Sequence, residues 1–124
     1  MAQPRLTSTV AVRPLPELTD AAQQRYGFAY TITIRNTGDV AAQVIARHWV
    51  ITDHHGTVQQ VRGLGVVGHQ PLLQPGEQFE YTSGAQIATP QGSMRGTLMA
   101  ITEDAHWFES PVAEFALADT ATLH

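Results

Sequence analysis

The chain lacks two residue types on which much protein chemistry depends. It has no cysteine among its 124 residues, so disulfides, thiolate zinc sites and thiol nucleophiles are excluded. Lysine is absent as well, because all seven basic residues are arginines. A Schiff-base lysine, a phosphate-loop lysine and a Ser-Lys dyad are therefore excluded. An arginine fork can still hold a phosphate or carboxylate group in two places.

Charge is also scarce, and so are long apolar runs. Charged residues make up 15% of the chain and the formal net charge is −4. A protein that tracks a nucleic-acid backbone needs a basic face, so we expect no nucleic-acid binding. No apolar stretch approaches the ~20 residues that span a bilayer, and the first residues do not read as a signal peptide. We therefore expect no membrane partner and a cytoplasmic location.

What is present is a globular composition with strong strand signals. Hydrophobic residues make up 43% of a chain of single-domain length, which predicts one domain over residues 1–124 with a loosely held tail at 118–124. The best strand signal covers residues 28–35, where Phe28, Tyr30, Ile32 and Ile34 alternate with smaller or polar residues. Such alternation is typical of a strand with one face in a core.

Further strand-like segments recur between turn sequences. They cover residues 7–13, 43–52, 57–62, 79–83, 94–102 and 106–117. We expect Pro14 and Pro16 to close the first of these segments, and one short helical turn to fit before Gln24. Pro111 indicates an edge position or a bulge in the last. About seven strands at this spacing predict an all-β, immunoglobulin/fibronectin-III-like β-sandwich.

The strand at 43–52 is apolar on both parities, as a central strand covered on two faces would be. The alternation pattern of this strand therefore does not tell which side faces the core. We expect Trp49 to be buried in the core. Arg47 shares the parity of Trp49 and has two readings. It either pairs with a carboxylate near the sheet rim, such as Glu80 or Glu114, or lines an anion or peptide pocket.

The segment 63–68 matches the letters of the Gly-x-Gly-x-x-Gly dinucleotide motif. That motif requires a helix whose N-terminus faces the pyrophosphate, and Pro71 and Pro75 prevent one here. Two readings remain. In the first, the loop is bulged and crosses between sheets, with Val66 and Val67 in the core. In the second, backbone amides form an anion nest. The candidate pyrophosphate-binding residues are Arg62, Gly63, Gly65, Gly68, Arg47 and Arg95.

Other chemistry finds little support. Asp53, His54 and His55 suggest a metal site, but adjacent histidines point apart and the Asp-x-x-Gly sequence is typical of an exposed turn. We therefore assign no metal ligands. Ser83 does not lie in a Gly-x-Ser-x-Gly elbow, so no catalytic residue is assigned.

Several strings, taken together and in order, resemble the ApaG family along nearly the whole chain. They are FAYTITIRN at 28–36, RHWVITD at 47–53, GLGVVG at 63–68, LQPGE at 73–77, YTSG at 81–84 and TPQGSMRG at 89–96. The resemblance implies a fibronectin-III-like sandwich. It also implies a stand-alone cytoplasmic protein linked to diadenosine-polyphosphate metabolism and divalent-cation homeostasis. Related domains fused to F-box and polymerase-delta-interacting proteins look like protein-recognition modules. The family often has an acidic residue in or just after the glycine motif. Leu64 and His69 occupy those positions here, which weakens a metal-carboxylate mechanism.

Three functional hypotheses follow. The favoured one is a non-enzymatic module that binds a protein or an extended peptide at a sheet edge or loop end. The alternative is binding or hydrolysis of pyrophosphate or dinucleoside polyphosphates through the 63–68 loop. The third is cobalt or magnesium handling. No cofactor is assigned, while a divalent cation and a homo-oligomer are left open.

Overall fold

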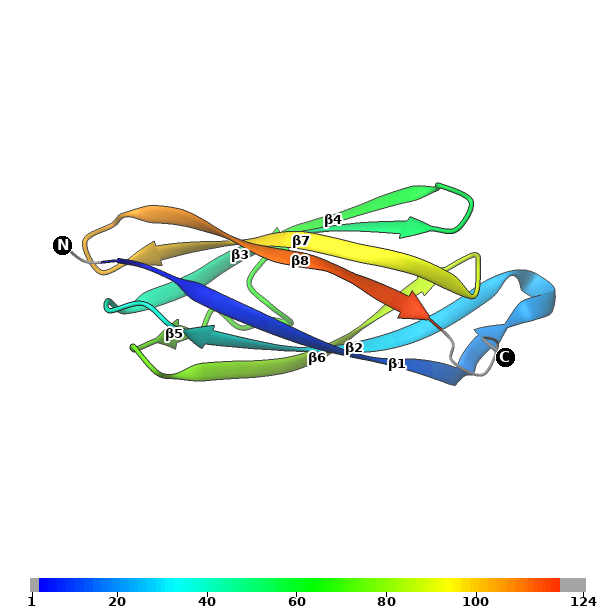
Figure 1. Cartoon of the computed structure of the whole chain (residues 1–124), viewed down its shortest axis with the longest axis horizontal. Helices are drawn as coiled ribbons and strands as arrows, with labels where there is room; N and C mark the ends of the chain where they lie inside the picture. The colour runs from blue at the N-terminus through cyan, green and yellow to red at the C-terminus, as the bar shows by residue number, and fades with distance from the viewer. Residues whose placement is uncertain (1–2, 119–124) are drawn as a thin grey trace.

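The structure is a computed structural model that describes residues 3–118. Its eight strands are all antiparallel in their pairing and form two sheets (Figure 1). The first sheet has the order β1 (Leu6–Asp20), β2 (Arg25–Asn36), β6 (Gln78–Ile87). The second has the order β4 (Val58–Leu64), β3 (Ala42–Asp53), β7 (Gln91–Thr102), β8 (Trp107–Ala118), with β5 (Leu72–Leu73) also pairing with β3.

The predicted all-β, fibronectin-III-like sandwich is confirmed. The additional strand is β5, which has only two residues and lies in a segment expected to be a connection. A 3-10 helix at Ala21–Gln23 supplies the short helical turn expected before Gln24. Ala118 ends β8 and does not begin a tail, and the rest of the predicted tail lies outside the described residues.

The core lies between the sheets, on the face of each sheet that points toward the other, here called the inner face. Phe28, Ile32 and Ile34 of β2 are completely buried, which confirms the alternation seen in the sequence. Trp49 on β3 is buried as expected and makes edge-to-face contacts with Tyr30 and Phe115, at ring-centroid distances of 6.0 and 6.4 Å. Because Tyr30 lies on β2, Trp49 joins the two sheets.

A β-bulge explains the mixed apolar pattern of β3. The pairing with β7 shifts register between Val44 and Ala46, so the strand contains one extra residue there. Before the bulge Val44 is buried, and after it Trp49 and Ile51 are buried. The inner face therefore changes parity within one strand, and Arg47 lies on the inner side of the second half.

Proline does not end β1, contrary to the sequence-based expectation. The strand continues to Asp20, and Pro14 pairs with Phe28 and Leu15 with Gly27 before the register shifts. Since β1 pairs only with β2, it has a free edge, and a proline on a free edge removes no ladder hydrogen bond. The expectation for Pro111 is confirmed, because β8 is an edge strand with a bulge after Val112.

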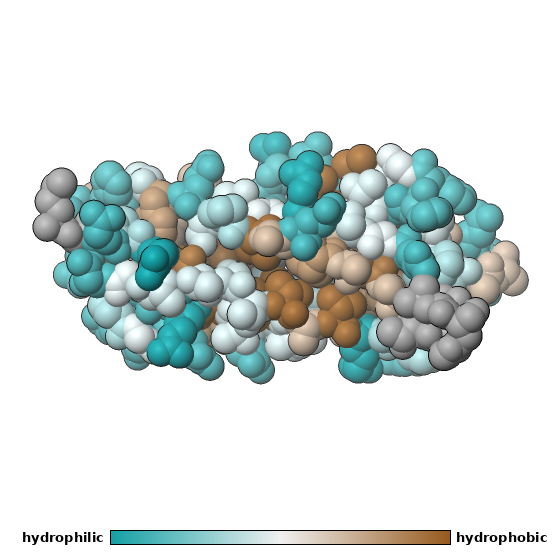
Figure 2. All heavy atoms as spheres, viewed as in Figure 1, coloured by the Kyte–Doolittle hydropathy of each residue, from teal (hydrophilic) through white to brown (hydrophobic). Residues whose placement is uncertain are grey.

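The two sheets meet edge to edge along one side of the sandwich, whereas along the other side the larger sheet extends beyond the smaller one. On the closed side β1 packs on β8, and the Ser110 hydroxyl donates to the Leu6 carbonyl at 3.1 Å. Figure 2 shows apolar side chains gathered between these two strands in the middle of this face. On the other side the first sheet ends at β6, while the second extends one strand further to β4, at the margin of the molecule in Figure 1. β4 therefore overhangs the smaller sheet.

Candidate functional site

The glycine motif forms a tight turn at the end of β4. Val66 and His69 exchange two backbone hydrogen bonds of 2.7 and 3.1 Å. Between them Val67 and Gly68 have φ values of 50° and 79°, the signature of a primed hairpin turn. No helix follows within the described residues, which confirms the prediction that the glycine motif does not lead into a helix.

The valine pair differs from its predicted environment. Val66 is completely buried, as expected, but the side chain of Val67 is 52% exposed and its backbone is left-handed. The loop also stays within one sheet, because β4 and β5 both pair with β3. The prediction that it crosses between the two sheets is therefore wrong.

The glycines of the motif serve local packing. Gly65 has a φ of 68°, and a Cβ on it would lie 2.5 Å from the His69 carbonyl oxygen. Gly63 pairs with Arg47 across β3 and β4, and a Cβ there would lie 2.7 Å from Arg47 Nη1. The guanidinium thus rests on the bare backbone of Gly63.

Arg47 is bound to the chain itself. Its Nη1 donates to the carbonyls of Leu64 and Gly65 at 3.2 and 3.1 Å, where Glu80 or Glu114 had been expected as partners. The nearby Tyr81 hydroxyl is buried, and burial, with Tyr30 adding to it, raises its pKa far above the ordinary value despite the opposing charge of Arg47. Tyr81 is therefore a neutral hydroxyl at physiological pH. The inner side of the turn is a packing site in which Arg47 fixes the backbone.

We predict that Gly63→Ala destabilises the fold by displacing Arg47. The loss of two charge-assisted hydrogen bonds should lower the free energy of unfolding by about 1–2 kcal/mol. In an Arg47→Met background the same change should cost far less, and urea unfolding of the four proteins measures that difference. Gly84→Ala is the matched control, because its Cβ would meet nothing closer than the Phe28 carbonyl oxygen at 3.5 Å. Equal costs of Gly63→Ala in both backgrounds would contradict the role given to Arg47.

The other predicted anion-binding arginines lie elsewhere. Arg62 pairs with His48, and Arg95 pairs with Val50, so both are on the outer face of the sheet, opposite to Arg47. Two of the loop amides are also engaged, since Gly65 N donates to Ile45 O at 2.6 Å and Val66 N to His69 O at 2.7 Å. Pyrophosphate binding at this loop stays a prediction from the sequence, and the geometry does not gather its residues around one ligand.

The histidine turn shows no metal-like arrangement. His54 and His55 lie in the β3–β4 turn, where the Asp53 carboxylate accepts from the backbone N–H groups of His55 and Thr57, both at 2.9 Å. Over residues 3–118, no group of three His, Cys, Asp or Glu side chains is placed to hold a metal ion. The same part of the chain has no helix that could cross a membrane.

The β4 edge, defined as Val58–Leu64, is the most exposed strand of the structure. All its seven residues are exposed except Gly63, which is half-buried. Val58, Val61 and Leu64 are 53%, 37% and 75% exposed. Val61 pairs with the buried Trp49, so it faces inward and is nevertheless open to solvent. β4 lies one strand beyond the edge of the smaller sheet, and only its Gln59 side chain is seen to hydrogen-bond across to that sheet in residues 3–118, where Nε2 donates to the Gln86 carbonyl of β6 at 3.1 Å.

A shallow groove of about 510 Å³ adjoins this edge on the outer face. Arg62 and Leu64 form its β4 side, and it runs across the sheet to Met99 on β7 and Glu109 on β8. Between these ends the groove is lined by Ala46, His48 and Thr97, with the positive Arg62 and the negative Glu109 at opposite ends. A side chain entering from the β4 edge would meet Leu64 first.

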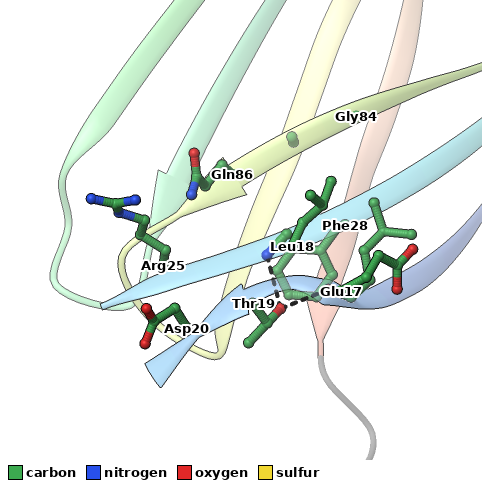
Figure 3. Close-up of a pocket in the computed structure, with 11 residues that line it drawn as sticks. Glu17, Leu18, Thr19, Asp20, Arg25, Phe28, Gly84 and Gln86 are labelled. Carbon is green, nitrogen blue, oxygen red and sulfur yellow. Dashed lines mark hydrogen bonds between the residues drawn. The ribbon is translucent and has the colours of Figure 1, made fainter. Parts of the chain in front are cut away.

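A second hollow, of about 640 Å³, lies on the outer face of the smaller sheet (Figure 3). The end of β1 folds over β2 there, with Leu18 above Gly27, and Thr19 accepts from Gly27 N at 3.2 Å. Leu18 is 60% exposed, and Asp20 and Arg25 lie at one end. Sequence reasoning missed this hollow because it placed the end of the strand before Pro14.

The comparison with known proteins identifies the family. The family model described as the ApaG domain matches residues 16–102, well over half of the chain. The chain belongs to the ApaG family. The ApaG match contains the β4 edge and the glycine turn, whereas β8 and most of β1, which close the opposite side, lie outside it.

Relatives and solved structures agree with this membership. Protein ApaG of Ralstonia nicotianae is 59% identical over 124 residues, covering 100% of both chains. Protein ApaG of Bordetella pertussis is 59% identical over 119 residues, which are 96% of this chain and 91% of that protein. The crystal structure of the putative ApaA protein from Bordetella pertussis superposes with a TM-score of 0.92 at 57% identity, covering 96% of this chain and 97% of that one.

Proposed function

We propose that this ApaG-family protein is a non-enzymatic, cytoplasmic recognition module that binds an extended segment of a partner protein. The segment adds to the larger sheet as a strand beside β4. The observation that carries the proposal is the exposure of the β4 edge, which within residues 3–118 pairs only with β3 and has exposed side chains on both faces. Strand addition of this kind gives affinity through main-chain hydrogen bonds and specificity through alternate side chains.

The other sheet edges are protected in ways that β4 is not. Natural edges are blunted by proline, charge, bulges or cover. β1 has Pro14, Pro16 and a register shift, and β8 has Pro111 and a bulge. β6 lies against the β4 side, where Gln59 Nε2 donates to Gln86 O at 3.1 Å. β4 has no proline, no acidic residue and a single charged side chain, Arg62.

The groove on the outer face supplies selectivity in this proposal. A strand added beside β4 would direct every second side chain toward this face, next to Leu64 and Arg62. Apolar side chains of the partner can cover Leu64, which is 75% exposed. Arg62 favours a partner side chain that accepts hydrogen bonds. The proposal assigns no catalytic residue.

The test compares partner capture by the wild-type chain and by a Val58→Lys/Leu64→Lys variant. Lysine on an edge strand opposes strand addition, so a reproducible partner of the wild type should be depleted at least about tenfold in quantitative pull-downs with the variant. Both positions are exposed, so folding stability should change by no more than about 0.5 kcal/mol.

Leu18→Lys is the matched control, because Leu18 is similarly exposed but lies on the outer face of the other sheet. It should capture the same partners as the wild type. The proposal fails if the wild type captures no reproducible partner, or if the double variant captures the partner as well as Leu18→Lys does.

A further inference from the structure

We propose that a second copy of this chain occupies the β4 edge, in an antiparallel β4–β4 pair about a two-fold axis at Val61. The inference rests on the proposed function, because it uses the same exposed edge. It joins the larger sheets of two copies into one continuous sheet. Self-pairing then regulates the edge, since a partner segment must displace the second copy.

The residue pattern of β4 is complementary to itself. In a two-fold interface each residue meets the same patch of the partner copy. An axis at Val61 places the two Val61 side chains opposite each other, Gln60 opposite Arg62, and Val58 opposite Leu64. Opposed residues of an antiparallel pair share a face, so the exposed Val58 and Leu64 bury each other on the outer face. Within one copy the Gln60 amide oxygen already lies 2.9 Å from His48 Nε2 and accepts from Arg62 Nη2 at 3.5 Å, and in the pair Arg62 of the second copy would join this polar group.

Other registers lose these contacts. An axis at Arg62 sets two guanidinium groups directly opposite each other, which is destabilising. An axis at Gln60 sets Val58 against Arg62 and carries Leu64 beyond the start of β4, opposite Gly56 in the turn. Only the axis at Val61 uses all seven residues of the strand and matches every apolar residue with another.

The overhang of β4 leaves room for the second copy. Gln59 and Val61 both point to the inner side, where Gln59 reaches the Gln86 carbonyl of β6 at 3.1 Å and Val61 stays 37% exposed at the place where the two Val61 side chains would meet. One strand pair of this length is a small interface, below the roughly 1,000 Å² that stable complexes bury. The self-pair is therefore weak and depends on concentration, which allows a partner segment to replace it.

The test uses the absence of cysteine from the natural chain. Val61→Cys introduces one thiol, and opposed Cα atoms of a strand pair, about 4.5–5.5 Å apart, are within disulfide range. Under mild oxidation at high protein concentration, Val61→Cys should form a disulfide-linked dimer at least about tenfold faster than Gln60→Cys, which would face Arg62 instead of its own counterpart. The double variant Gln60→Cys/Arg62→Cys should crosslink readily.

The proposal is overturned if Val61→Cys forms no dimer, or if it crosslinks no faster than Gln60→Cys. Urea should abolish the difference in crosslinking rate between the two variants, because it unfolds the strand pair. If the difference persists in urea, it does not come from β4–β4 pairing in the folded protein. The outcomes separate this inference from the proposed function. If Val61→Cys fails while the wild type captures a partner through β4, only self-pairing is refuted. If crosslinking succeeds and no partner is captured, only partner recognition is refuted.

Discussion

Trp49→Ala is expected to lower the free energy of unfolding by about 3–5 kcal/mol, the range for deleting a large aromatic side chain from a core. Trp49 is 1% exposed and contacts Tyr30 on the opposite sheet and Phe115 on β8. Gly96 lies directly beneath the ring, where a Cβ would collide with it, so the site is shaped for this side chain. Because domains are stable by only about 5–15 kcal/mol, the variant should lose a large part of its stability.

The measurement is urea unfolding followed by far-UV circular dichroism. Trp107, the only other tryptophan, is 53% exposed and gives the matched control. Trp107→Ala should change the unfolding free energy by about 0.5 kcal/mol or less. If the two alanine variants are equally stable, Trp49 does not join the sheets in the way the structure shows.

Asn36→Ala should be the second large effect, at about 2–4 kcal/mol. The side chain of Asn36 is 1% exposed, and its Nδ2 donates to the carbonyls of Val40 and Leu73 at 2.9 and 2.8 Å. Its Oδ1 accepts from Gly38 N at 2.9 Å. Alanine removes all three hydrogen bonds from a buried position, so the net loss of each bond adds to the cost of the desolvated groups that lose a partner.

Gln43→Ala is the control for Asn36→Ala. Gln43 also donates an amide hydrogen bond to a backbone carbonyl, that of Gln70 at 3.0 Å, but in an exposed position. Its loss should cost about 0.5–1 kcal/mol in the same unfolding assay. Equal costs for the two substitutions would show that burial adds nothing to the role of Asn36.

The sequence predicted secondary structure correctly where a single local signal, such as hydrophobic alternation or proline, determined it. The alternation around Ile32 specified a strand with one buried face, and Pro71 and Pro75 excluded a helix after the glycine motif. It failed where a local irregularity overrode the rule. The extra residue in β3 reverses which parity is buried, so the strand looks apolar on both parities and its core-facing side cannot be assigned from the sequence. Pro14 was misread because its tolerance depends on β1 lying at an edge.

The candidate site was less accessible to prediction. The role of Gly63 depends on the Arg47 guanidinium resting on it, which requires the register between β3 and β4. The exposure of Val61 depends on the unequal widths of the two sheets, which is a property of the assembled sandwich. A signal did exist for the β4 edge, since residues 58–64 have no proline and no acidic side chain.

The hydrogen bond between Ser110 and Leu6 joins residues 104 positions apart in the chain. During synthesis, β1 is therefore made well before β8, the last of the described strands. The contact between β1 and β8 cannot form until β8 has emerged from the ribosome. Contacts of such long sequence separation carry a high loop-closure entropy, so the chain should fold slowly, in milliseconds to seconds. While β8 has not yet emerged from the ribosome, the apolar side of β1 that it covers stays exposed, which favours aggregation of the unfinished domain.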